Sequence, residues 1–89
     1  MAKKRRKLNK DFERKIYSSK KNVELVLAKI YDIDDEDIQK EYMSAFNKVV
    51  VLYEELKVDY ELQGFSDNSE ELLTNYKNAF NLFESEFEI

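Results

Sequence analysis

The sequence predicts an all-α fold, and three features of its composition and spacing support this. The chain has one Gly and no Pro among 89 residues, whereas a β-fold of this size needs several tight turns rich in these residues. Apolar residues recur at three- and four-residue steps, as on the buried side of a helix. A hydrophobic content of 43% is sufficient for a core. We expect a flexible basic head over residues 1–10 and a single three-helix domain over residues 11–89.

The first helix is predicted over about residues 10–31. Its apolar stripe consists of Phe12, Ile16, Val23, Leu27 and Ile30. The polar run at residues 18–21 interrupts this stripe, and a serine there can cap a helix. Two starts therefore remain open, one near residue 10 and one at Ser18 or Ser19 that leaves the basic head outside the helix.

The second helix is predicted over about residues 35–63. Its stripe consists of Ile38, Tyr42, Ala45, Phe46, Val49, Leu52, Tyr53, Leu56 and Tyr60. Asp34 can cap its start, and the acids that follow complement the positive end of the helix dipole. We expect the helix to end at Gly64 in a left-handed conformation, with Phe65 folding back toward Tyr60.

The third helix is predicted over about residues 69–87, after a loop at residues 66–69 in which Asp67 or Ser69 can act as the cap. Its stripe consists of Leu72, Leu73, Tyr76, Ala79, Phe80, Phe83 and Phe87. The second and third helices then form a long antiparallel hairpin, and the first helix packs across it. Because the second helix is the longer by about ten residues, its excess length should be covered by the first helix or by another copy of the chain.

Three consecutive valines, Val49 to Val51, indicate that the second helix is packed on more than one side. Each residue of a helix is rotated by about 100° from the last, so three successive side chains cannot share one stripe. At least one of them should meet another surface. We therefore predict an oligomer interface made by Val49, Val50, Val51 and Tyr53.

The composition argues against an enzyme. The chain has no His and no Cys, which removes the usual general base near neutral pH, the Ser-His-Asp relay and most zinc sites. Asp32, Asp34 and Glu36 alternate as in a calcium-binding loop, but the sixth position is Asp37 rather than Gly and the twelfth is Met43 rather than Glu. We expect no catalytic residue, no metal site and no cofactor.

No segment of the sequence has the length and apolar character of a membrane span, and the first ten residues lack the apolar run of a secretory signal. The absence of Cys also fits a reducing compartment. We expect a soluble, cytoplasmic protein without a membrane partner.

Charge is strongly segregated along the chain. Residues 1–21 carry ten of the fifteen Lys and Arg residues and two acids, a net charge of +8, while residues 22–89 carry −12. Clustered bases neutralise phosphates and bind nucleic acid in a salt-dependent manner. The predicted nucleic-acid-binding residues are Lys3, Lys4, Arg5, Arg6, Lys7, Lys10, Arg14, Lys15, Lys20 and Lys21.

If the first helix reaches back to residue 10, Lys10, Arg14 and Lys21 lie along one side of it, apart from the apolar stripe. A basic helix of this kind can lie against double-stranded DNA. Two other interpretations remain open: the head is a disordered, solubilising terminus, or it docks on an acidic surface, either that of this chain or that of a partner.

The second and third predicted helices resemble part of a known family. The segment from Glu41 to Gly64, with Tyr42, Val49-Val50, Tyr53-Glu54-Glu55-Leu56 and Gly64-Phe65, resembles the long helix and glycine break of tailed-phage terminase small subunits. Leu73, Asn75, Ala79, Leu82 and the closing Phe87-Glu88-Ile89 resemble the family's next helix, so the resemblance covers residues 38–89. It implies a helical hairpin that builds a ring-shaped oligomer, and an N-terminal region that engages viral DNA for a large terminase subunit.

This chain departs from the family at two points. It lacks the Asn-Pro pair that often opens the second helix of the hairpin, and its N-terminal part is too short for a separate DNA-binding domain. DNA contact would therefore depend on the bases of residues 3–21.

Two classes of function follow from the sequence. The first is a non-enzymatic, oligomeric protein that binds double-stranded DNA, as the small subunit of a phage packaging terminase does. The second is a small acidic helical protein that binds another protein, such as a phage-encoded inhibitor, antitoxin or immunity protein. The first predicts assemblies larger than dimers and salt-dependent DNA binding, whereas the second predicts a monomer or dimer that does not bind DNA.

Overall fold

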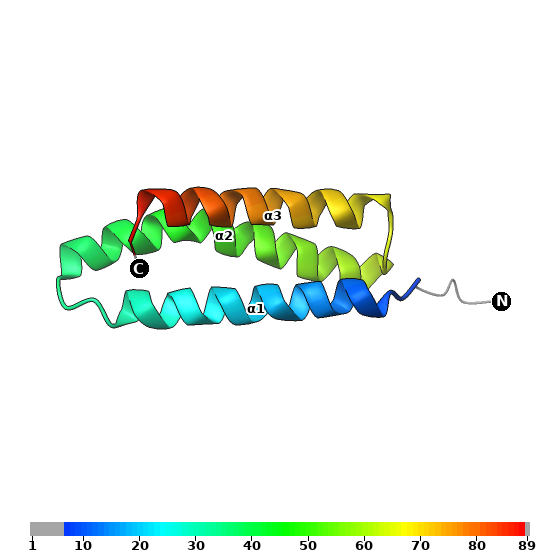
Figure 1. Cartoon of the computed structure of the whole chain (residues 1–89), viewed down its shortest axis with the longest axis horizontal. Helices are drawn as coiled ribbons and strands as arrows, with labels where there is room; N and C mark the ends of the chain where they lie inside the picture. Colours follow the sequence, from blue (N-terminus) through cyan, green and yellow to red (C-terminus); the bar gives the residue numbers. More distant parts are fainter. Residues whose placement is uncertain (1–6, 89) are drawn as a thin grey trace.

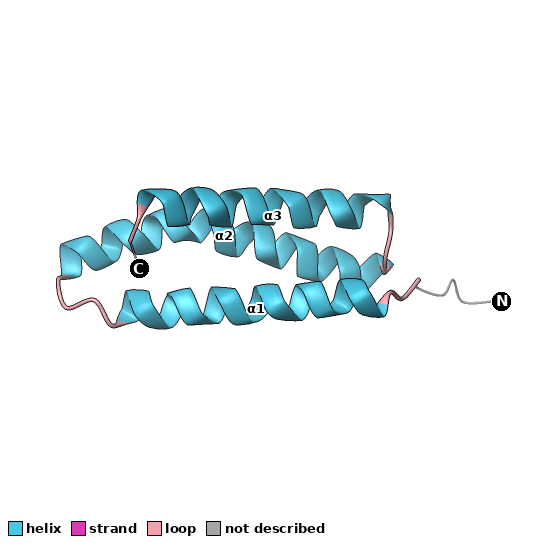
Figure 2. Cartoon of the chain, viewed as in Figure 1, coloured by secondary structure: helices cyan, strands magenta, loops and turns pink. Residues whose placement is uncertain are grey.

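The computed structural model describes residues 7–88 and consists of three helices joined by short loops (Figures 1 and 2). They are α1 (Lys10–Tyr31), α2 (Glu36–Gln63) and α3 (Asp67–Glu86). The predicted fold class is confirmed, because α2 and α3 form a long antiparallel hairpin and α1 packs along it. The helix α2 contacts both of its neighbours, whereas α1 and α3 make few contacts with each other.

The core lies along α2 and is built from all three helices. Its buried apolar side chains are Phe12, Val23, Val26, Ile30, Phe46, Val49, Tyr53, Leu56, Tyr60, Leu73, Tyr76 and Phe83. Burial of each large side chain stabilises the fold by about 1.5–3 kcal/mol relative to exposure. Phe46 is fully buried, and its ring lies 4.8 Å from the ring of Phe83 on α3. The predicted stripes therefore meet one another, and Val26 joins them from a position outside the stripe predicted for the first helix.

The earlier of the two predicted starts of α1 is the one observed. Asn9 is the cap, and its side chain accepts a hydrogen bond from the Phe12 N–H at 3.0 Å. The helix continues through the polar run because Ser19 is buried and its Oγ donates to the Lys15 carbonyl at 2.8 Å. This bond satisfies the buried hydroxyl within the helix, and bonding of this kind to the carbonyl four residues earlier destabilises a helix only slightly.

The observed caps of α2 and α3 differ from the predicted ones. At α2 the cap is Asp35 rather than Asp34, and it accepts from the N–H groups of Asp37 and Ile38 at 2.9 and 3.1 Å. The loop places the carboxylate of Asp35, rather than that of its neighbour, at the first free amides.

At α3 the cap is Ser66, so the helix begins at Asp67, earlier than predicted. Ser69 is not the cap but lies in the first turn, where its hydroxyl accepts from the Ser66 N–H at 2.9 Å and donates to the Gly64 carbonyl at 3.3 Å. The bond from the Ser66 N–H to the Ser69 hydroxyl is the contribution that the N3 side chain makes in a capping box.

Gly64 ends α2 with a positive φ, as predicted, but its φ of 73° and ψ of −159° lie outside the left-handed helical conformation expected of the cap. Its N–H donates to the Tyr60 carbonyl at 2.8 Å. Phe65 then packs edge-on against Phe12 of α1, with 5.1 Å between ring centroids, and Phe12 stacks on Tyr60 at 5.7 Å. The turn after α2 is thus closed by a ring from the start of α1.

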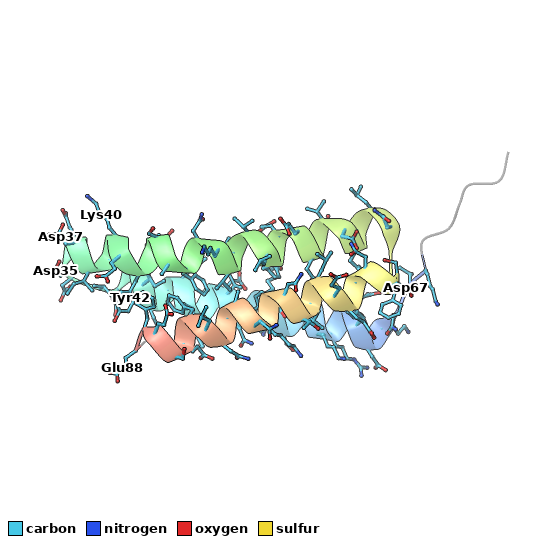
Figure 3. All side chains as sticks on the ribbon, turned by 90° about the horizontal axis from the view of Figure 1, so that it is seen from above. Asp35, Asp37, Lys40, Tyr42, Asp67 and Glu88 are labelled. Atoms are coloured by element: carbon cyan, nitrogen blue, oxygen red, sulfur yellow. The ribbon has the colours of Figure 1, made fainter. Side chains whose placement is uncertain are left out.

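The segment before α1 is paired with this same turn. An isolated parallel β-bridge joins Lys7 to Gly64, and the Phe65 N–H donates to the Lys7 carbonyl at 2.6 Å. At the other end of the molecule, the Tyr42 hydroxyl donates to the Glu88 carbonyl at 3.3 Å (Figure 3). Both ends of the described chain are therefore tied to the bundle by backbone groups.

Candidate nucleic-acid interface

The outer side of α1 carries a row of exposed bases. Lys10, Arg14 and Lys21 are all exposed and are separated by four and seven residues, so they lie on one side of the helix. Phe12 is buried on the opposite side. We call the row of these three bases the α1 ridge. It has the position that the sequence predicts for a basic surface distinct from the apolar stripe.

Two further bases flank the ridge. Lys15 lines a groove between α1 and α3, and Lys20 lines a groove between α1 and α2 to which α2 contributes Lys57. Both grooves also contain acids, Glu13 and Glu61 in the one toward α2 and Glu84 in the one toward α3, so the bases on the flanks alternate with negative charge.

The groove between α1 and α3 has a volume of about 460 Å³ and combines bases with amides and two aromatic rings. Its lining consists of Arg14, Lys15, Ser18, Ser19, Asn22, Tyr76, Lys77, Phe80, Asn81 and Glu84. The α3 base, Lys77, was not among the predicted binding residues. No local signal in the sequence identifies it, because its neighbourhood depends on which side of the hairpin α1 occupies.

The two acids at the start of α1 lie beside the ridge and offset part of its charge. Asp11 lies 3.7 Å from Arg14, and the two side chains are 88% and 81% exposed, so the pair is weak and can exchange with other ions. Glu13 is held by α2, because the Tyr60 hydroxyl donates to its Oε2 at 2.6 Å. That same hydroxyl accepts from the Asn9 N–H at 3.1 Å. Glu13 thus has a structural partner beside the ridge.

An aromatic ring lies within the ridge. Tyr17 is 58% exposed, and the Lys21 Nζ lies 5.0 Å from its ring centroid. A cation over an aromatic face at this distance is attracted to it. A ligand that approaches α1 therefore meets the Tyr17 ring and the Lys21 ammonium group together.

The predicted basic head divides at residue 7. Lys3, Lys4, Arg5 and Arg6 lie outside the described residues. Lys7 is exposed, its carbonyl is bonded to the Phe65 N–H, and its Nζ lies 5.9 Å from the Phe65 ring centroid. Lys10 is the first residue of α1.

The predicted oligomer interface is placed partly inside the chain. Val49 and Tyr53 belong to the core and are 1% and 5% exposed, Val50 is half-buried, and Val51 is 46% exposed. From Val49 to Val51 the side chains therefore pass from the core to solvent, as a rotation of about 100° per residue requires. Val49 and Tyr53 are covered within one copy of the chain, and Val51 is the member of the predicted set that is exposed to a second copy.

The titratable groups of the described region do not form a reactive cluster. Burial raises the pKa of Tyr76 to about 12, and burial, followed by the charge of Glu54, raises the pKa of Tyr53. Across residues 7–88, no three acidic side chains gather closely enough to hold a metal ion. Within the same residues no helix has an apolar stretch that could cross a lipid bilayer.

Comparison with known proteins adds no relative of this chain. No protein-family model, no curated protein and no solved structure matches it. The function is therefore argued from the surfaces of the chain itself.

Proposed function

We propose that this protein binds double-stranded DNA through the basic side of α1 and has no catalytic activity. The observation that carries the proposal is the α1 ridge, in which Lys10, Arg14 and Lys21 are exposed along one side of a helix. Lys15 and Lys20 extend the charge to both flanks. The net charge of the whole chain is −4, so this local concentration of bases is opposite in sign to the rest of the molecule.

The dimensions of the ridge suit a phosphate backbone. At 1.5 Å per residue, Lys10 and Lys21 are about 16 Å apart along the helix axis. Duplex DNA carries one phosphate per about 1.7 Å of its axis, so a helix lying along or across the backbone meets several phosphates at once. Contacts of this type tolerate any base sequence, because phosphates carry no sequence information.

The finer proposal concerns the role of DNA binding. The resemblance of residues 38–89 to terminase small subunits supports a ring-shaped homo-oligomer that presents many copies of α1 to viral DNA and works with a large terminase subunit. Several weak contacts then act together, and their combined affinity exceeds that of any one of them.

The proposal is tested by measuring, with fluorescence anisotropy, the binding of the protein to a short labelled DNA duplex of random sequence. The measurement is repeated at several salt concentrations. The variant Lys10→Gln/Arg14→Gln/Lys21→Gln should bind more weakly. The slope of the logarithm of its association constant against the logarithm of the salt concentration should become less steep by about 0.9 for each base that contacted a phosphate. The matched control is Lys29→Gln/Lys40→Gln/Lys48→Gln, which makes the same change in net charge at exposed positions away from the ridge.

An equal loss of DNA affinity in the two triple variants would contradict the proposal, because affinity would then depend on net charge alone. Absence of salt-dependent binding by the unaltered protein would also contradict it and would favour the alternative, a protein-binding regulator. Deletion of residues 2–6 separates the contribution of the four most N-terminal bases from that of the ridge. We expect this deletion to weaken binding while the difference between the two triple variants persists.

A further inference from the structure

A second surface, on the far side of α2, is independent of the basic ridge. It is a groove of about 580 Å³ on the side of α2 that faces away from the core. We call it the α2 outer groove and define it by Val51, Glu55, Val58, Asp59 and Leu62 of α2 and Leu72 of α3.

The floor of the α2 outer groove is apolar. Val51 and Val58 are each 46% exposed and Leu62 is 72% exposed. These residues are spaced by seven and four positions, so they lie in one row along the helix. Single exposed apolar side chains are common, but a continuous row of them beside a half-buried leucine is typical of a contact surface.

The walls of the groove are acidic. Glu54, Glu55 and Asp59 line it, and no Lys or Arg is among the described residues that do so. The Oδ2 atom of Asp59 is buried and has no hydrogen-bond partner in the described part of the chain. A buried carboxylate oxygen without a donor costs free energy.

The end of α2 adds to the negative field. The last turn of α2 contains no basic residue, although cations are favoured at the negative end of a helix dipole. The row of apolar side chains ends in this turn, at Leu62. A cation that entered the groove near Asp59 would therefore complement both the acidic wall and the dipole.

A second copy of this chain that packs about a two-fold axis is a poor occupant of the groove. If two copies packed their α2 helices face to face about a two-fold axis with residue 51 of one near residue 62 of the other, Glu54 of each copy would lie near Asp59 of the other. Like charges brought together in this way oppose association. The occupant should instead bring apolar and basic side chains together.

We propose that the α2 outer groove binds a basic amphipathic α-helix of a partner protein. Aliphatic side chains of that helix pack on Val51, Val58 and Leu62, and its Lys or Arg residues pair with the acidic walls, including Asp59. The row from Val51 to Leu62 is about 16 Å long, which accommodates three turns of a helix. This is the helix-in-groove mode of recognition, with anchors repeated at three- and four-residue steps.

A synthetic peptide of defined chemistry tests the proposal with the full-length protein. The probe is a labelled helical peptide of five turns, with Leu at three- and four-residue steps on one side and Lys elsewhere. Two control peptides replace either Lys by Glu or Leu by Gln. Fluorescence anisotropy should detect binding of the probe and at least about tenfold weaker binding of either control, because both the apolar and the charged contacts are needed.

Variants of the protein locate the contact. Val58→Ser and Asp59→Asn should each weaken binding of the probe, Val58→Ser by about tenfold since it removes a central anchor. Leu82→Ser, a comparable change from an apolar side chain to Ser, and Asp34→Asn, the same change as Asp59→Asn, are the controls at exposed positions outside the groove. If Val58→Ser fails to fold, as judged by circular dichroism, the double variant Val51→Ser/Leu62→Ser takes its place at two exposed positions.

The proposal is overturned if the probe does not bind, if the groove variants and their controls lose affinity equally, or if the Gln peptide binds as well as the probe. It is also overturned if Val58→Ser lowers the molecular mass measured by light scattering, since the groove would then hold a second copy of the chain. None of these results depends on whether α1 binds DNA, so the two proposals fail separately.

Discussion

Single hydroxyl groups position α1 on the hairpin. The Tyr60 hydroxyl is bonded to Asn9 and Glu13 at the start of α1, and the Tyr76 hydroxyl donates to the Ser19 carbonyl, at 3.3 Å, in its middle. The sequence predicts that both tyrosines belong to apolar stripes. It cannot predict their polar contacts, because each partner lies more than 45 residues away in the chain. The continuity of α1 through Ser19 is one result of these contacts.

The stability of the protein should depend on the ionisation of Tyr76 at high pH. Burial raises the pKa of this tyrosine from 10.0 to about 12, so the neutral hydroxyl is favoured in the folded state. Stability from this group is complete below pH 10 and is lost as the pH rises toward about 12. Urea unfolding monitored by circular dichroism should show that the free energy of unfolding falls between pH 10 and about pH 12.

The variant Tyr76→Phe should show a smaller fall in stability over the same interval, since it has no group to ionise. Tyr53, whose pKa is also raised, should account for part of the remainder. An unchanged fall in Tyr76→Phe would mean that the ionisation of Tyr76 does not control alkaline unfolding.

The helices themselves were predictable to within a few residues, but their caps were not. Apolar spacing predicts the helices because burial of a stripe requires the helical period. Asp34 and Asp35 are equally able to cap α2, and Ser66, Asp67 and Ser69 are all suitable at α3. The path of each loop selects among them, and that path depends on packing between helices.

Gly64 is the residue on which the junction of α2 and α3 most depends. Its φ of 73° and ψ of −159° lie in a region that residues with a Cβ atom rarely adopt. Gly64→Ala should lower the free energy of unfolding by about 1–3 kcal/mol, measured by urea denaturation. Gln63→Ala, one residue earlier at an exposed helical position, should change it little, and a similar loss in both variants would show that the glycine conformation is not the cause.

At the scale of the whole molecule, the antiparallel arrangement followed from three helices joined by short connections. The groove between α1 and α3 could not be predicted in this way. It brings Arg14 of α1 near Lys77 of α3. Periodicity identifies which side of a helix is buried but not which two neighbours it lies between. The same limit explains why Val49 and Tyr53, predicted to join copies of the chain, are used within one copy.

Self-association is predicted at this scale. A chain of 89 residues without Cys has a small core and no disulfide to support it, and the proposed packaging role requires a ring. Light scattering coupled to size-exclusion chromatography should give a mass above that of a dimer, falling on dilution as subunits dissociate. A monomer mass at every concentration would leave DNA binding possible but would contradict the ring.

The pairing of Lys7 with the turn at Gly64 and Phe65 has a consequence for how the molecule opens. Because the Phe65 amide is bonded to the Lys7 carbonyl, and Phe12 packs on Phe65, two segments distant in sequence share one end of the bundle. Fraying of the first residues of α1 cannot occur without exposing the turn between α2 and α3. This end should therefore behave as one cooperative unit, in which the N-terminal segment acts as a latch on the hairpin.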